Sequence, residues 1–138
     1  MYLSRKKGLI SMDKKILDTP NAPQAVGTYS QVVEINNLIF TSGQIGLDPL
    51  TGKLVEGGMI AQTEQILKNI SLILTDIGLD KENIIKLTVF LIDLEQFSII
   101  NSSFQSFFSE TAFPARSTVE VSRLPLDALV EIECVAHR

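Results

Sequence analysis

The chain has 138 residues, of which 45% are hydrophobic and 20% are charged, and its formal net charge is −4. This length predicts one domain with a real core, because a chain of about 150 residues buries roughly 70% of its unfolded surface. The acidic balance argues against a nucleic-acid-binding protein, which needs clustered Lys and Arg, and no apolar run approaches the roughly 18 residues of a membrane span.

Residues 1–11 contain the sole basic run, but no apolar stretch long enough for a signal peptide follows them. We therefore expect a flexible extension ahead of one domain at residues 12–138, and a cytoplasmic protein. The single cysteine, Cys134, excludes an internal disulfide and alternates with apolar residues like a small buried hydrophobe. We predict no cofactor and no metal, since one Cys and one His are too few for a typical zinc site, although a carboxylate-bound metal stays open.

The first half of the domain is predicted to form strands and turns. Residues 15–18 predict a short edge strand, and residues 30–34 and 38–42 predict a hairpin around the turn at residues 36–37. Gly43 follows this hairpin. A glycine there permits close approach of a ligand to the backbone, although a simple turn or bulge is the more ordinary interpretation.

The second half combines helical and strand patterns. Apolar residues between 60 and 77 recur with helical spacing and predict a helix that covers the sheet, with Gly78 suited to end it. Residues 84–92 are β-branched and apolar enough for a central strand. The aromatic side chains of residues 97–108 also follow helical spacing, and we assign them to core packing. The order of elements predicts an α+β fold, with a mixed sheet of about six strands and two helices on one face.

The most informative stretch is residues 113–133, where side chains alternate with a period of two. The pattern predicts two strands joined by a short turn, with Arg116 and Thr118 on one face, to which a neighbouring strand can bring Glu131. A rigid guanidinium fork, a hydroxyl and a carboxylate would then converge. A polar strand face is also typical of a sheet with one side in water, so the residues alone leave both interpretations open.

Several short motifs follow one another from Lys14 to the C-terminus: Asn21-Ala22-Pro23, Gly27-Thr28-Tyr29-Ser30-Gln31, Thr41-Ser42-Gly43-Gln44-Ile45, the turn from Pro49 to Gly52, Asn101 before Phe107-Phe108, Pro114 to Val121, and Val130 to Glu133. In this order they resemble the signature of the RidA (YjgF-type) family of reactive-intermediate deaminases. Many members have cysteine where Thr118 stands and proline where Thr28 stands. Threonine keeps a hydrogen-bonding group but removes a thiol, so the substrate range stays open.

The resemblance implies a chorismate-mutase-like fold and a homotrimer with ligand clefts between subunits. It also implies hydrolysis of enamine and imine intermediates, such as 2-aminoacrylate and 2-iminobutanoate, to 2-oxo acids and ammonia. In the matching positions, Arg116 binds the substrate carboxylate with help from the backbone N–H of Gly43. Thr118 and Glu131 hold the attacking water near the imine carbon, which makes Arg116, Thr118 and Glu131 the expected catalytic residues.

Two further positions, Tyr29 and Asn101, match residues that line the cleft, at least one of them across the subunit boundary. The strongest alternative is a non-catalytic trimer of the same fold that binds a small ligand or a protein. A ribonuclease role, sometimes attached to this family, fits poorly with an acidic chain and a single histidine. The deaminase assignment requires Arg116 and Glu131 to project from the same face of the sheet.

Overall fold

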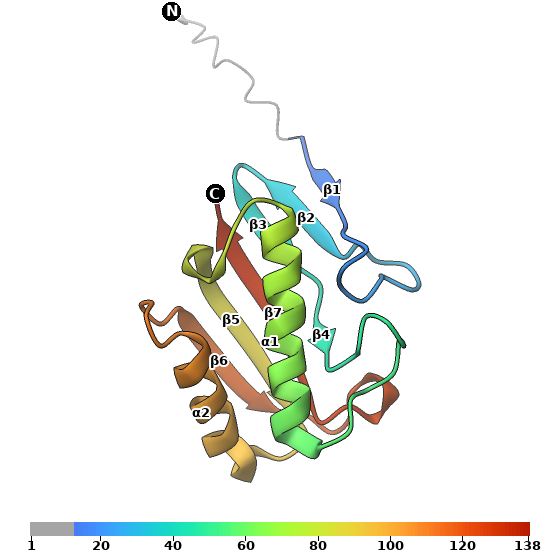
Figure 1. Ribbon diagram of the computed structural model, residues 1–138, viewed down its shortest axis with the longest axis vertical. Coiled ribbons are helices and arrows are strands. Elements are labelled where there is room, and N and C mark those ends of the chain that lie inside the picture. Colours follow the sequence, from blue (N-terminus) through green and yellow to red (C-terminus); the bar gives the residue numbers. More distant parts are fainter. Residues whose placement is uncertain (1–12) are drawn as a thin grey trace, which may run out of the picture.

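The computed structural model describes residues 13–138, in which two helices pack on one face of a seven-stranded sheet (Figure 1). The strands are β1 (Lys15–Leu17), β2 (Val32–Ile35), β3 (Leu38–Thr41), β4 (Gln44–Ile45), β5 (Ile84–Leu91), β6 (Ala115–Glu120) and β7 (Val130–His137). The helices are α1 (Gly58–Asp76) and α2 (Phe97–Phe107). The predicted α+β class with two helices on one face is confirmed, whereas the expected extension at residues 1–11 lies outside the described residues.

The sheet has the order β1-β2-β3-β7-β5-β6, and β4 pairs with β7 beyond the end of β3. The pairing of β5 with β6 is parallel, and the other pairings are antiparallel. The expected count of about six strands omits β4. A strand of two residues is too short to show the alternation by which strands are recognised in a sequence.

The core lies between the helices and the centre of the sheet. Apolar side chains of α1 meet alternate side chains of β5 and β7, and the buried residues of these three elements include Ile66, Ile70, Ile73, Leu74, Leu87, Val89, Leu91, Val130 and Ile132. Burial of one such side chain contributes about 1.5–3 kcal/mol. The hairpin of β2 and β3 turns at Asn36 and Asn37, both with positive φ of 50° and 64°, the conformation that the twist of a two-residue hairpin requires.

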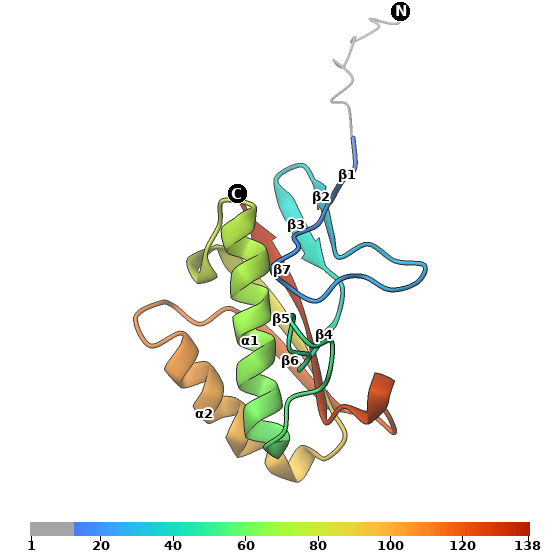
Figure 2. The same cartoon turned by 45° about the vertical axis from the view of Figure 1, so that its right-hand side comes forward.

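The opposite face of the sheet has no helix from residues 13–138 over it, since both helices lie on the same side (Figure 2). This open face presents Ile16, Phe40 and Val119, which are 55%, 41% and 43% exposed, together with the half-buried Phe90 and Val135. Within residues 13–138, no helix has both the length and the apolar character to cross a membrane.

Candidate active site

Arg116 lies on the edge strand β6 and extends over the aromatic side chains of α2. Its guanidinium carbon is 5.0 Å from the centre of the Phe97 ring and 5.4 Å from that of Phe104, distances at which a cation is attracted to an aromatic face. No acidic side chain among residues 13–138 forms a salt bridge with Arg116. The guanidinium is therefore positioned by the rings while its donors stay available to an anion.

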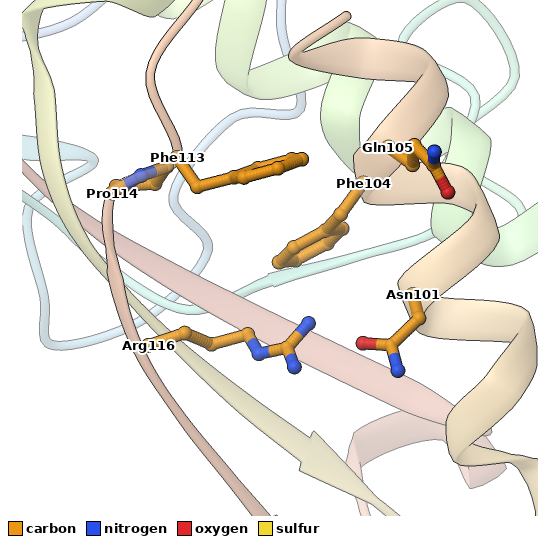
Figure 3. A pocket seen from close by; sticks show the side chains of 6 residues that line it. All are labelled: Asn101, Phe104, Gln105, Phe113, Pro114 and Arg116. Atoms are coloured by element: carbon orange, nitrogen blue, oxygen red, sulfur yellow. The ribbon is translucent and has the colours of Figure 1, made fainter.

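The side chain of Arg116 lines a cavity of about 560 Å³ (Figure 3). The other lining residues are Asn101, Phe104, Gln105, Phe113 and Pro114. The amide of Asn101 and the guanidinium point into the same space. Thr118 lies two residues further along β6 and shares the face of Arg116. Its Oγ1 is buried and has no hydrogen-bond partner in the described part of the chain. We call Arg116, Thr118 and Asn101 the Arg116 group.

Glu131 lies on β7, beside Gly43 in the segment between β3 and β4. A Cβ added at Gly43 would stand 2.7 Å from Oε1 of Glu131 and 2.8 Å from its Cδ, so any side chain at position 43 would displace this carboxylate. Burial raises the pKa of the Glu131 carboxyl above its ordinary value, and the charge of Glu133 adds to that rise. A carboxyl with a raised pKa beside a cavity is typical of a proton-transfer group.

Glu131 and Gly43 line a second cavity, of about 680 Å³. Tyr29, which is 54% exposed, comes to the same cavity from the segment between β1 and β2. Gln31 fixes this segment, because its Oε1 accepts from the N–H of Thr19 at 2.7 Å and its Nε2 donates to the carbonyl of Pro23 at 2.9 Å. We call Glu131, Gly43 and Tyr29 the Glu131 group.

The two groups lie on opposite faces of the sheet. Arg116 pairs with Leu87 of β5, whose side chain is buried on the helix side, whereas Glu131 pairs with Phe90, an odd number of residues further along β5. Successive side chains of a strand alternate between faces, so these two positions point to opposite sides. The prediction that Arg116, Thr118 and Glu131 project together from one face of the sheet is therefore wrong, and the same-face condition of the deaminase assignment is not met within one chain.

The topology explains this error. The connection through α2 places β6 parallel to β5 at the outer edge of the sheet, and the chain then returns to β7 on the other side of β5. The strands that carry Arg116 and Glu131 are therefore neighbours in sequence but not in the sheet. The backbone N–H of Gly43, expected beside Arg116, likewise belongs to the Glu131 group.

Three further side chains at the two groups were not predicted as part of the site: Phe97, Phe104 and Leu126. Phe104 is buried, as its assignment to the core predicted, but Phe97 and Phe104 also support the guanidinium of Arg116. Leu126 lines the cavity of Glu131, and its left-handed backbone conformation could not be predicted from the sequence. Among residues 13–138, no three His, Cys, Asp or Glu side chains lie close enough together to hold a metal ion.

Comparisons with known proteins place the chain among its relatives. Residues 19–138 match the family model described as Endoribonuclease L-PSP. A RutC family protein of Synechocystis is 46% identical over 91% of this chain and 97% of its own length. The 2-iminobutanoate/2-iminopropanoate deaminase of Mus musculus is 41% identical over 91% of this chain and 93% of its own length.

The solved structures agree with the sequence relatives. A Rid family protein from Yersinia pestis is 46% identical and superposes with a TM-score of 0.89, covering 91% of this chain and 100% of that one. Sequence identity of 41–46% over 91% of the chain shows membership of the same protein family and not only a shared fold. The chain therefore belongs to the RidA (YjgF-type) family, as its ordered motifs predicted.

Proposed function

We propose that this protein hydrolyses 2-imino acids, and enamines such as 2-aminoacrylate, to 2-oxo acids and ammonia at a site completed by two copies of the chain. The observation that carries the proposal is the separation of a cation and a proton-transfer carboxylate into two open cavities on opposite faces of one sheet. The name of the mouse relative supports the reaction. Each chain holds two different halves of such a site.

The open face of the sheet supports association of copies. Its exposed Phe40 and Val119 would remain in water in a lone chain, and an uncovered apolar sheet face is typical of an interface. Glu131 lies on this face beside Phe90. A second copy that covers the face therefore comes within reach of Glu131, and we propose that the edge strand β6 of such a copy brings its Arg116 there. We propose three copies in a closed ring, as the family resemblance implies.

The Arg116 group would bind the substrate. The guanidinium fork matches the two oxygens of a 2-imino acid carboxylate, and such charge-assisted paired bonds fix orientation as well as affinity. The Asn101 amide lies in the same cavity. Thr118 follows on the same strand, but its unpartnered hydroxyl is buried and does not line that cavity. This half orients the planar imine but supplies no base.

The Glu131 group of the neighbouring copy would supply that base. Glu131 accepts a proton from water as the water oxygen bonds to the imine carbon, and then passes the proton to the nitrogen. The hydroxyl of the resulting carbinolamine then gives its proton through Glu131 to the nitrogen as the C–N bond breaks, so that ammonia leaves and the water oxygen remains as the carbonyl of the 2-oxo acid. An enamine such as 2-aminoacrylate first takes up a proton at its terminal carbon and becomes the imine. The backbone N–H of Gly43, beside Glu131, provides a neutral donor for an oxygen of the substrate.

Two other functions are less well supported. RNA cleavage, suggested by the description of the family model, has little support in a chain of net charge −4 with one histidine, His137, at the end of β7. A non-catalytic ligand-binding assembly needs only the cavity of Arg116 to bind an anion, and it gives no role to the raised pKa of Glu131 beside a second cavity.

A coupled assay tests the proposal directly. A pyridoxal-phosphate-dependent threonine dehydratase generates 2-iminobutanoate, and the appearance of 2-oxobutanoate is followed with and without the protein. We expect a faster appearance that is proportional to protein concentration, and light scattering should report three chains per particle. Binding of 2-oxobutanoate by calorimetry without any acceleration would instead support the non-catalytic assembly.

A further inference from the structure

Leu126 has an unusual backbone conformation in the turn that leads into β7. Its φ and ψ are 56° and 25°, in the left-handed region that residues other than glycine rarely adopt. The turn is closed by the N–H of Ala128, which donates to the carbonyl of Pro125 at 3.1 Å, and the exposed ion pair of Arg123 with Asp127, at 2.9 Å, lies across it. Such strain persists only where the surroundings hold it, and it is often found at ligand sites.

The turn presents Leu126 to the cavity of Glu131 instead of burying it in the core. Leu126 is 67% exposed, and Val26, from the segment between β1 and β2, is 83% exposed on the same cavity. The same cavity is also lined by the apolar Pro23, Ala25, Ile45, Leu47 and Pro125 and by the polar Gln24, Gln31, Ser42 and Gln44. The carboxylate of Glu131 and the backbone of Gly43 thus share this cavity with seven apolar side chains, including those of Leu126 and Val26.

The proposed chemistry determines which part of the substrate meets this lining. The substrate carboxylate is bound by Arg116 of one copy, and the imine carbon must lie beside Glu131 of the other. The third substituent of that carbon is the substrate side chain, which must then extend along the remaining wall of the Glu131 cavity. At about 680 Å³, the cavity is within the roughly 300–1,000 Å³ of pockets that enclose drug-sized ligands, and it is larger than a methyl side chain needs.

We infer that Leu126 and Val26 form a side-chain subsite, and that the protein prefers 2-imino acids with bulky aliphatic side chains over 2-iminopropanoate. The inference rests on the proposed function. The physical reason is burial of apolar surface, since one methylene in a hydrophobic pocket changes relative kcat/KM by about 10-fold or more. Leu126 would act on specificity and would not take part in proton transfer.

The experiment compares imines of two sizes. An L-amino-acid oxidase generates the imine of alanine or of leucine, and semicarbazide traps what the protein has not hydrolysed. We expect a higher kcat/KM for the leucine imine, and we expect Leu126→Gly, which tolerates the same φ, to reduce that preference about 10-fold. Leu126→Met should keep it. Leu50→Gly is the matched control, because Leu50 is 95% exposed and does not line this cavity.

The possible results separate the inference from the function on which it rests. Failure to hydrolyse either imine would overturn both. Hydrolysis of the alanine imine without a preference for leucine, or with the same preference in Leu126→Gly, would overturn the subsite and leave the proposed function standing. Equal loss of both activities with a fall in particle mass would show that Leu126 is a contact between copies, which also overturns the subsite.

Discussion

Arg116 and Glu131 lie on strands separated by a single strand, yet they project from opposite faces of the sheet. The register across β5 fixes this relationship, because Leu87 and Phe90, their respective partners, have opposite orientations. Side-chain rotation cannot carry a group through a sheet. A reaction that needs both residues around one small substrate therefore needs two chains.

Mixing two inactive variants should restore activity. Arg116→Ala removes the guanidinium that would bind the substrate carboxylate, and loss of one member of such a buried charge pair costs about 2–5 kcal/mol. Glu131→Gln keeps the shape of the side chain but removes the base. In assemblies formed from equal amounts of the two variants, about one quarter of the interfaces in a ring combine an intact Arg116 with an intact Glu131. The mixture should recover roughly that share of the wild-type rate in the coupled assay.

The control for this experiment is a mixture in which no interface is complete. Arg116→Ala combined with the double variant, which lacks both side chains, should stay inactive. Native mass spectrometry establishes that copies have exchanged. If mixed assemblies form and the two single variants still fail to complement each other, the site does not join Arg116 of one copy to Glu131 of the next.

Gly43→Ala should impair catalysis without unfolding the protein. The added Cβ would stand 2.7 Å from Oε1 of Glu131, and the flexible end of that side chain can move aside more easily than backbone. Displacing a catalytic group by about 1 Å can cost roughly 10²-fold in rate. We expect a loss of this order in kcat for imine hydrolysis, with a circular dichroism spectrum like that of the wild type.

A double-variant cycle identifies the route of this effect. If Gly43→Ala acts by moving the carboxylate, it should cause little further loss in a protein that already carries Glu131→Ala. An equal loss in both backgrounds would mean that Gly43 acts independently of Glu131, for instance through its own N–H. The cycle therefore tests the packing of Gly43 against Glu131 rather than the importance of either residue alone.

Much of the fold could be predicted because local patterns determine it. The apolar period of α1, the strand β5 and the paired asparagines of the β2–β3 hairpin are local signals, and each predicted element is present. The two-residue strand β4 carries no such signal. The sequence also suggested that both helices cover the same face, which leaves the other face for a partner.

The site could be predicted as a set of residues but not as an arrangement. Arg116, Glu131 and Gly43 were found through motifs, and motifs do not contain strand order. Whether two strands share an edge or flank a third is decided by the crossover through α2, a long-range feature. With β5 between the two strands, the registers of Arg116 with Leu87 and of Glu131 with Phe90 set the two side chains on opposite faces. The left-handed Leu126 was missed because leucine gives no indication of a positive φ.

The C-terminal Arg138 should contribute to stability by closing the hairpin end of the sheet. Its Nε and Nη2 donate to the two carboxylate oxygens of Glu34 at 2.7 and 3.1 Å, and its Nη1 donates to the carbonyl of Ile77 at 2.8 Å. Glu34 is only 5% exposed, so Arg138→Ala leaves a buried acceptor unpaired. We expect the free energy of unfolding to fall by about 1–3 kcal/mol in urea titrations.

Arg123→Ala is the control for this stability measurement, because its ion pair with Asp127 is largely exposed and should contribute under about 1 kcal/mol. The hydrogen bond with Arg138 lowers the pKa of the Glu34 carboxyl below its ordinary 4.5. Because the pKa of Glu34 is lower in the folded than in the unfolded protein, the ionised carboxylate stabilises the fold at pH values above the unfolded pKa. This contribution is lost as the pH falls through the folded pKa. The difference between wild type and Arg138→Ala should therefore shrink below pH 4.5, and a difference that grew in acid would contradict the pairing.

The pH dependence of hydrolysis should report the environment of Glu131. The base must be ionised to accept a proton from water, and burial, with the charge of Glu133, raises its pKa above 4.5. The acid limb of kcat/KM should therefore have its midpoint above pH 4.5. Glu133→Gln removes the like charge and should move that midpoint downward, while burial keeps it above 4.5. With imine supplied by an excess of amino-acid oxidase, a midpoint that does not move in Glu133→Gln would mean that another group limits the reaction.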